Sequence, residues 1–261
     1  MAQALVTGGT SGIGKAFVEA LAARGDDVVI VARDAKRMQE LAEELGTKHG
    51  VHIEWITADL AKAEDVTRVA DWIEDPAHEL DLVVNNAGFG LHAKLLDKNQ
   101  LGTQRRAFDV MAWAVLELSG AAGRAMVARG HGRIINVSST SSWIFSGNYS
   151  ALKAWVRSYT EALNIELHKS GTDVRATALC PGWVHTEFHQ RAGVSSDNLP
   201  GFVWLDPDQL VREALADSAA GRAISIPSAK WKAAIFVAKL PIATPIIRTL
   251  SSKLSSSRQK K

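Results

Sequence analysis

Short apolar segments alternate with amphipathic helical segments along most of this chain, and this alternation restricts its fold more than any other feature. The strand-like segments, such as DVVIVA (27–32) and LDLVVNN (80–86), are continuous apolar runs, which are typical of strands buried on both faces. Repeated β-α-β order gives right-handed crossovers and a parallel sheet. The sequence therefore predicts an α/β fold with a parallel sheet in a single domain.

The expected elements follow one another at short intervals. Strands are expected at 4–7, 27–32, 52–57, 80–86, 132–139 and 174–180, and helices at 14–24, 35–49, 64–75, about 100–129 and 149–169. Residues 183–205 form an irregular segment that contains Gly and Pro. Long loops in compact domains are usually functional, so we expect this segment to be a lid over a substrate.

Composition excludes several classes of protein. The chain has 261 residues, of which 46% are hydrophobic, and this is enough to bury one sizeable core. A net charge of +2 gives no electrostatic reason to expect a nucleic-acid partner, and no apolar run reaches the ~18 residues of a transmembrane helix. The single cysteine, Cys180, excludes an internal disulfide, and no signal peptide is visible, so we expect a cytoplasmic protein.

Basic residues are concentrated toward the carboxyl terminus. After Asp217 the chain has nine Lys or Arg residues and no Asp or Glu. We expect a basic helical extension and tail over residues 229–261, which could touch anionic lipid, cover a pocket or join two subunits. Apolar residues at 235–237 favour burial of this helix against protein over contact with a membrane surface.

A glycine-rich turn, TGGTSGIG (7–14), joins the first expected strand to the first helix. Small residues let the backbone approach a diphosphate, and the helix start offers unpaired N–H groups and the positive end of its dipole. The spacing Gly-x-x-x-Gly-x-Gly is one residue longer than the commonest dinucleotide fingerprint. We therefore expect a bound nucleotide rather than only a tight connection.

The end of the second strand indicates which nucleotide binds. An acidic side chain about 20 positions after the turn binds the ribose diol of NAD(H), whereas an arginine accommodates the 2′-phosphate of NADP(H). The sequence there is Ala32-Arg33-Asp34. Arg33 favours NADP(H), and Asp34 keeps NAD(H) possible.

Tyr149 and Lys153 lie four positions apart at the start of an expected helix, so their side chains share one face. A free tyrosine has a pKa of about 10, and an ammonium within about 4–6 Å favours the phenolate. We expect Lys153 to lower the pKa of Tyr149 toward neutrality, which would suit proton transfer to a carbonyl oxygen. The other tyrosine, Tyr159, has Leu163 at the same offset.

Five motifs occur in order between about Leu5 and Ile226: TGGTSGIG (7–14), NNAG (85–88), NVSS (136–139), YSALK (149–153) and PGWVHT (181–186). With them the chain resembles the classical short-chain dehydrogenase/reductase family. The resemblance implies a doubly wound parallel sheet of the Rossmann type in three α/β/α layers, with a cofactor at the carboxyl edge of the sheet. It further implies one NAD(P)-binding domain over residues 1–228 that includes the catalytic residues and the lid. It also implies a small carbonyl or alcohol substrate and a homo-oligomer, either a dimer or a tetramer.

The resemblance also implies roles for individual residues. Ser139 would hydrogen-bond the substrate oxygen, and Tyr149 would act as acid and base. Lys153 would tune Tyr149 and hold the nicotinamide ribose. Asp59 would approach the adenine, and Thr186 would contact the nicotinamide carboxamide. The residues expected to bind the cofactor are Gly8, Thr10, Ser11, Gly12, Ile13, Gly14, Arg33, Asp59, Leu60, Asn86, Ala87, Gly88, Tyr149, Lys153, Pro181, Gly182, Val184 and Thr186.

Two features complicate this resemblance. Ser138 and Ser141 are rivals of Ser139, and the loop from Ser139 to Tyr149 is a short form. The family usually has an asparagine in the long fourth helix that supports a water chain from the lysine, whereas this chain has Met111. A thioether cannot replace an amide as donor and acceptor, so we expect a slower or re-routed proton relay.

Aromatic residues flank the expected substrate site. They are Trp143 and Phe145 after the serine motif, and Trp183, Phe188, Phe202 and Trp204 in the lid. Aromatic residues in irregular segments beside a site favour an apolar substrate, so we expect a hydrophobic ketone or secondary alcohol. His185 and His189 are four positions apart without a third ligand in sight, and we expect no metal.

The sequence therefore predicts an NADP(H)-preferring oxidoreductase that interconverts a carbonyl and a secondary alcohol. One alternative is a nucleotide-sensing or scaffold protein of the same fold without turnover. Another is a nucleotide-sugar epimerase or dehydratase that retains its cofactor.

Overall fold

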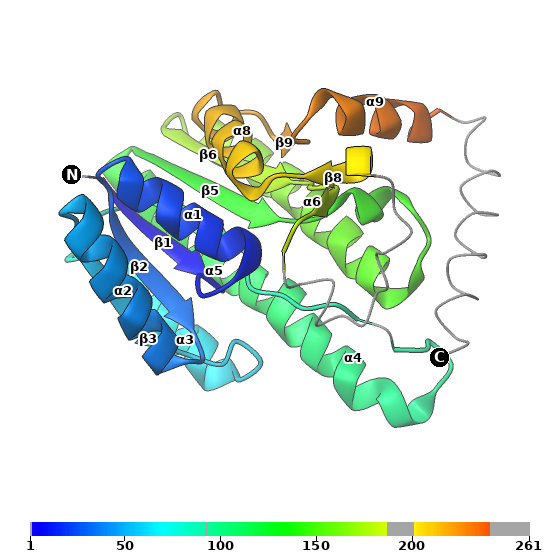
Figure 1. The fold of residues 1–261 in the computed structure, drawn as a ribbon, viewed down its shortest axis with the longest axis horizontal. Helices are drawn as coiled ribbons and strands as arrows, with labels where there is room; N and C mark the ends of the chain where they lie inside the picture. Colours follow the sequence, from blue (N-terminus) through cyan, green and yellow to red (C-terminus); the bar gives the residue numbers. More distant parts are fainter. Residues whose placement is uncertain (1, 92, 187–200, 241–261) are drawn as a thin grey trace.

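The computed structural model describes residues 2–91, 93–186 and 201–240 (Figure 1). Within them a seven-stranded sheet has the order β3-β2-β1-β4-β5-β6-β9, and every neighbouring pair is parallel. The order reverses beside β1, so the sheet is doubly wound, and this confirms the predicted fold. The strands are β1 (Gln3–Thr7), β2 (Asp27–Ala32), β3 (Ile53–Thr57), β4 (Leu80–Asn85), β5 (His131–Val137), β6 (Asp173–Leu179) and β9 (Ile224–Ser225).

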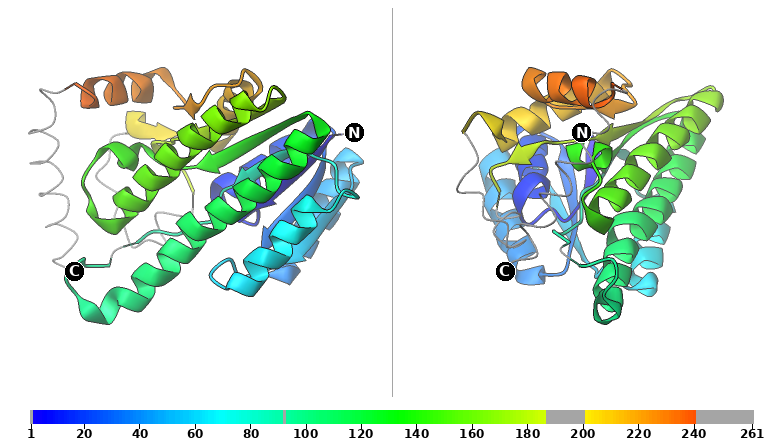
Figure 2. Two further views of the ribbon diagram at one scale, coloured as in Figure 1. Left: turned by 180° about the vertical axis from the view of Figure 1, so that it is seen from behind. Right: turned by 90° about the vertical axis from the view of Figure 1, so that its right-hand side faces the viewer.

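Helices cover both faces of the sheet (Figure 2). One layer contains α1 (Gly12–Ala23), α2 (Ala35–His49) and α8 (Pro207–Ala219), and the other contains α3 (Ala63–Glu74), α5 (Ala114–Arg129) and α6 (Gly147–Lys169). Successive side chains of a strand point to opposite faces. In β2, Val28 and Ile30 join one apolar cluster, while Val29 and Val31 join the other. The strands are continuously apolar because both of their faces are buried.

The long helical region before β5 changes its geometry along its length. It runs through η1 (Lys98–Gln100), α4 (Leu101–Phe108), the π-helical turn η2 (Asp109–Trp113) and α5. By length and composition the stretch Lys98–Arg129 could cross a membrane, but most of its apolar part is buried inside the protein. Packing against the sheet accounts for that composition.

The region after β6 differs from the expectation of a wholly irregular lid. Its two ends form β7 (Trp183–Val184) and β8 (Trp204–Leu205), which pair in parallel as a small second sheet, with η4 (Gly201–Val203) before β8. Lid residues 187–200 lie outside the described residues. The sequence analysis also does not predict α8 or β9. A two-residue strand carries no periodic signal, but α8 has visible start signals, because Asp206 caps it and Pro207 occupies its first position.

The expected basic helix is α9 (Ala229–Ala238), which extends past β9 along the top of Figure 1. Of its three apolar residues at 235–237, Ile235 is buried, whereas Phe236 is 68% and Val237 is 56% exposed. The predicted burial against protein is therefore only partly correct for this helix. The tail at 241–261 lies outside the described residues.

Candidate active site

The glycine-rich turn lies between β1 and α1, at the carboxyl edge of the sheet. Gly8 and Gly12 have φ angles of 68° and 55°, a region that favours glycine. A Cβ atom on Gly14 would lie 2.2 Å from the carbonyl oxygen of Gly8, so only glycine fits there. The Gly8 N–H donates to the carbonyl oxygen of Val31 at 2.7 Å and fixes the turn to β2. The other turn residues that we predict to bind the cofactor, Thr10, Ser11 and Ile13, are partly exposed.

Asn86 and Ala87 brace this turn from the end of β4. The buried Thr7 hydroxyl accepts from the backbone N–H of Asn86 at 2.9 Å and of Ala87 at 3.0 Å. The Asn86 amide donates to the carbonyl oxygens of Thr7 at 3.0 Å and Gly8 at 3.3 Å. Asn86 thus holds the turn in shape. The sequence analysis does not single out Thr7, although it belongs to the motif.

Met111 packs against Gly88, the last residue of the NNAG motif. Its side chain is fully buried in the π-helical turn η2, and a Cβ atom on Gly88 would lie 3.3 Å from its Sδ. Single π-helical turns inside α-helices occur frequently at functional sites. An apolar side chain therefore fills the position that the resemblance assigns to an asparagine, and its effect on a proton relay stays a prediction.

Arg33 and Asp34 differ in what their side chains do. Asp34 caps α2, because its Oδ1 accepts from the Arg37 N–H at 3.1 Å. Arg33 directly follows β2 and is exposed. Since the Asp34 carboxylate is engaged in capping, the arrangement favours Arg33, and with it NADP(H), over a ribose contact by Asp34.

Asp59 and Leu60 follow β3, as predicted for the adenine end of the site. Leu60 is buried in the core beneath this edge. Asp59 pairs with Arg106 of α4, whose Nη2 donates to Oδ1 at 3.1 Å and to Oδ2 at 3.0 Å. The sequence analysis does not single out Arg106, and nothing in its local pattern marks it.

Ser139, Tyr149 and Lys153 meet between β5 and α6. Tyr149 and Lys153 lie near the start of α6, and the Ser139 side chain lies close enough to the Tyr149 phenol to lower its pKa. The Ser139 Oγ also accepts from the Ser141 N–H at 3.1 Å. The rival Ser138 instead donates its hydroxyl to the carbonyl oxygen of Lys153 at 2.7 Å. The structure therefore places Ser139, and not Ser138, beside the Tyr149 hydroxyl, while the catalytic roles stay predictions.

The pKa of the Tyr149 phenol is raised, whereas the sequence predicts that it is lowered. Burial raises the pKa of the Tyr149 phenol well above its usual value, and the hydrogen bond with Ser139 only partly opposes this. Burial also lowers the pKa of Lys153 to about 8, which the neighbouring Cys180 opposes. The Lys153 Nζ donates to the carbonyl oxygen of Val137 at 2.8 Å and lies 5.8 Å from the centroid of the Tyr149 ring. The expected lowering of the Tyr149 pKa by Lys153 is not found, because desolvation of the phenol dominates.

The segment after β6 joins the two halves of the site. The carbonyl oxygen of Pro181 accepts from the Thr140 N–H at 2.9 Å, beside the serine motif. A Cβ atom on Gly12 would lie 3.5 Å from the Cβ of Thr186, so Thr186 lies against the glycine-rich turn. Val184 belongs to β7, which lies between Pro181 and Thr186 in the sequence, and its side chain is buried. The predicted residues of this segment thus lie between the turn and the serine motif.

Helix α9 covers Gly182. A Cβ atom on Gly182 would lie 2.0 Å from the indole Cε2 of Trp231. The Trp231 Nε1 donates to the carbonyl oxygen of Val203 at 3.1 Å. At the other end of α9, the Lys239 Nζ lies 5.1 Å from the centroid of the Trp143 ring. The basic helix therefore contacts both segments that flank the site, and the sequence analysis singles out neither Trp231 nor Lys239.

The aromatic residues that we expect at the substrate site are partly engaged with one another. Trp183 and Trp204 make an edge contact with centroids 5.8 Å apart, and His185 stacks on Trp204 at 4.4 Å. Phe145 is 60% exposed. Phe188, His189 and the side chain of Phe202 lie outside the described residues.

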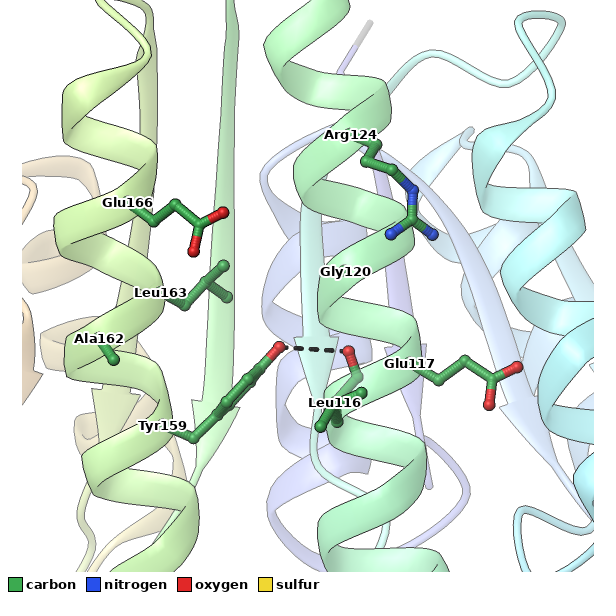
Figure 3. Close-up of a pocket in the computed structure, with 8 residues that line it drawn as sticks. All are labelled: Leu116, Glu117, Gly120, Arg124, Tyr159, Ala162, Leu163 and Glu166. Carbon is green, nitrogen blue, oxygen red and sulfur yellow. Dashed lines mark hydrogen bonds between the residues drawn. The ribbon is translucent and has the colours of Figure 1, made fainter.

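The second tyrosine occupies a different environment (Figure 3). Tyr159 points from α6 toward α5, and its hydroxyl donates to the carbonyl oxygen of Leu116 at 3.2 Å. It borders a hollow of about 430 Å³ on the outer helical layer, lined by Leu116, Glu117, Gly120, Arg124, Tyr159, Ala162, Leu163 and Glu166. Tyr159 is therefore a natural control for experiments on Tyr149.

Several proteins with similar sequences are named as dehydrogenases or reductases. The family model described as short chain dehydrogenase matches residues 2–196. The chain is 39% identical over 192 residues to galactitol 2-dehydrogenase (L-tagatose-forming) of Cereibacter sphaeroides, which covers 70% of this chain and 72% of that protein. It is 31% identical over 189 residues to 11-beta-hydroxysteroid dehydrogenase A of Sesamum indicum, covering 71% of this chain and 53% of that protein.

A solved structure gives the same result for the fold. The short-chain dehydrogenase from Sphingobium yanoikuyae in complex with NADPH superposes with a TM-score of 0.81 and 31% identity. The superposition covers 91% of this chain and 93% of that chain. The match spans only 53% of the sesame enzyme and 60% of an uncharacterized oxidoreductase of Bacillus subtilis. The match therefore identifies the family but not the substrate.

Proposed function

The chain belongs to the short chain dehydrogenase family, and from this premise we propose that it uses NADP(H) to interconvert a carbonyl and a secondary alcohol. The observation that carries the proposal is the meeting of Ser139, Tyr149 and Lys153, in which the Lys153 Nζ lies 5.8 Å from the centroid of the Tyr149 ring, one turn back along the same helix. This group lies at the same edge of the sheet as the glycine-rich turn. The proposed acid–base residues are therefore close to the proposed coenzyme site.

The residues at this edge fit a dinucleotide. The turn has no side chain where Gly14 approaches the backbone of Gly8, and it leads into the start of α1, which is suited to a diphosphate. Arg33 is exposed beyond β2, and its neighbour Asp34 is occupied as a helix cap. A related structure at 31% identity contains NADPH. These observations support NADP(H) as the preferred coenzyme, with NAD(H) as a weaker one.

The side chains divide the proton chemistry among them. When bound, the coenzyme supplies or accepts the hydride. The Tyr149 phenol, whose pKa burial raises above its usual value, carries its proton at neutral pH and would give it to a carbonyl oxygen during reduction. Ser139, which lies next to the Tyr149 phenol, would bind the same carbonyl oxygen. Lys153 remains mostly charged at neutral pH and lies 5.8 Å from the centroid of the Tyr149 ring, where its charge would favour the phenolate without outweighing the effect of burial.

The aromatic surroundings favour a hydrophobic substrate. Trp183 and Trp204 lie at the two ends of the lid, and Trp143 lies after the serine motif. Relatives named for a sugar alcohol and for a steroid are both similar to this chain, so their names do not decide between polar and apolar substrates. The cytoplasmic location and the assembly as a dimer or tetramer stay predictions.

The test is a titration with NADPH and NADH, followed by a panel of aliphatic, aromatic and steroid ketones and of small sugars. Tyr149→Phe is expected to lower kcat/KM by at least about a hundredfold, the usual contribution of a general acid, and to leave NADPH affinity within about threefold. Tyr159→Phe, which loses one hydrogen bond at the helical surface, is expected to leave kcat/KM within about twofold. Equal losses in the two variants would contradict the assignment of Tyr149. Faster turnover of sugars than of every ketone would contradict the hydrophobic substrate.

A further inference from the structure

Arg106 reaches from α4 to the turn after β3, where its Nη2 donates to both carboxylate oxygens of Asp59, at 3.1 and 3.0 Å. The two residues are 47 positions apart in the sequence. The Arg106 side chain is 44% exposed and the Asp59 side chain 23%, so the pair lies at the rim of the sheet edge. A single guanidinium nitrogen thus contacts both oxygens, and the ion pair ties α4 to this turn.

The Asp59 carboxylate is surrounded by hydrogen-bond donors and cations, of which Arg106 is one. Asp59 also accepts from the Ala61 N–H at 3.2 Å, and the neighbouring carboxylate of Asp65 is paired with Arg68. Burial tends to raise the pKa of Asp59, but the hydrogen bonds from Ala61 and Arg106 and the charges of Arg106 and Arg33 outweigh it, so the net shift is downward. Strands β2 and β3 pair in parallel up to Ala32 and Thr57, and the Ala58 N–H donates to the carbonyl oxygen of Ala32 at 2.9 Å, so Arg33 and Asp59 follow neighbouring strand ends and their charges interact.

Arg33 is the cation proposed to bind the 2′-phosphate, so the state of Asp59 matters for coenzyme choice. An unpaired Asp59 carboxylate would attract Arg33 and repel the phosphate. Resting on the proposed function, we propose that Arg106 is a specificity-determining residue that acts through Asp59. It neutralises the carboxylate and thereby leaves Arg33 free for the 2′-phosphate of NADP(H). NAD(H) lacks this phosphate, so Arg106 should affect its binding little.

The experiment compares Arg106→Gln with Arg105→Gln in the whole protein. Arg105 is the matched control, because it is the adjacent arginine of α4 and forms its own ion pair with Asp109 at 2.8 Å. The dissociation constants of NADPH and NADH are measured by fluorescence titration at low ionic strength. Arg106→Gln is expected to weaken NADPH binding roughly fivefold to tenfold, the size typical of partly exposed charges, while NADH changes by less than about twofold. Arg105→Gln is expected to change neither.

A second substitution separates this role from simple packing. Asp59→Asn removes the negative charge and keeps an oxygen for the Ala61 N–H. In the double variant Arg106→Gln, Asp59→Asn, the ratio of the NADH to the NADPH dissociation constant is expected to return to within about twofold of the unaltered protein. Asp59→Asn alone is expected to keep or increase that ratio, and it also serves as the test if Arg106→Gln does not fold.

The following results would overturn the inference. Arg106→Gln could weaken NADPH and NADH equally, which is the result expected of a purely structural residue. Asp59→Asn could lower the preference for NADPH, alone or in the double variant. If the unaltered protein binds neither coenzyme, the proposed function fails and this inference fails with it; an unchanged NADPH preference in Arg106→Gln overturns the inference alone.

Discussion

Gly14 and Gly182 both lie beside the proposed coenzyme site without room for a side chain, but different neighbours fill the space. A Cβ atom on Gly14 would lie 2.2 Å from the backbone oxygen of Gly8, within the same turn. A Cβ atom on Gly182 would lie 2.0 Å from the indole of Trp231, which belongs to α9. The first glycine is required by local backbone geometry, and the second by a helix from the far end of the chain. A motif can therefore identify the first kind of constraint, while the second becomes visible only in the packing.

The polar groups of the two regions differ in the same way. In the glycine-rich turn, Thr7 and Asn86 hold backbone N–H and C=O groups, which do not titrate. In the catalytic group, Lys153 places an ammonium at 5% exposure against the carbonyl oxygen of Val137. Stability should therefore depend on pH through the second region and not through the first.

The largest effect is expected from Gly14→Ala. Its Cβ atom would displace the backbone of Gly8, so NADPH should bind at least about a hundredfold more weakly, and the free energy of unfolding should fall by about 3 kcal/mol. Gly102→Ala in α4 is the control, because a Cβ atom there has no neighbour within 4 Å; it should leave NADPH affinity unchanged and add less than about 1 kcal/mol of stability. Coenzyme titration and urea unfolding measure both. Equal NADPH affinity in Gly14→Ala and Gly102→Ala would contradict the claim that local backbone geometry requires glycine at position 14.

The next effect concerns pH and Lys153. Burial lowers the pKa of Lys153 from 10.5 to about 8, so between these values the unfolded chain binds more protons than the folded one and stability rises with pH. Across this window the contribution is about 3 kcal/mol, at ~1.4 kcal/mol for each pH unit. Cys180, whose pKa burial raises to about 12, acts in the opposite direction above about pH 9. The measurement is therefore the difference between the unaltered protein and Lys153→Met.

Urea unfolding of these two proteins at pH 7.5 and at higher values up to about 10.5 gives that difference. Relative to Lys153→Met, the unaltered protein should gain stability as pH rises, because the penalty for the buried ammonium disappears. Parallel pH curves for the two proteins would mean that the ammonium is solvated and that the catalytic group carries no buried charge.

The smallest effect is expected from Gly182→Ala, which should lower the free energy of unfolding by about 2 kcal/mol by displacing the Trp231 indole. In a chain that already carries Trp231→Leu, the same substitution should cost less than about 0.5 kcal/mol, because the rigid ring is gone. No side-chain replacement can rescue Gly14→Ala in this way, since Gly14 faces backbone. An equal cost of Gly182→Ala in both chains would show that Trp231 does not close over this glycine.

Most of the sheet and of the first layer of the site could be predicted. The strand at 27–32 and the helix at 35–49 have the predicted bounds, and Ser139, Tyr149 and Lys153 are brought together as the motif order implies. The α8 helix could have been predicted from Asp206 and Pro207. The contact of Arg106 with Asp59 could not, because neither residue has a distinctive neighbourhood in the sequence.

The sequence by itself determined the order and double burial of the strands, the glycine-rich turn and the shared helix face of Tyr149 and Lys153. These features depend on backbone preferences and on side-chain periodicity within a few residues. Both are properties of the local sequence and do not require the rest of the fold. Only the tertiary structure decided that Arg106 pairs with Asp59, that burial raises the phenol pKa, and that Trp231 covers Gly182. Those outcomes depend on desolvation and on contacts between distant segments, which exist only once the layers have packed.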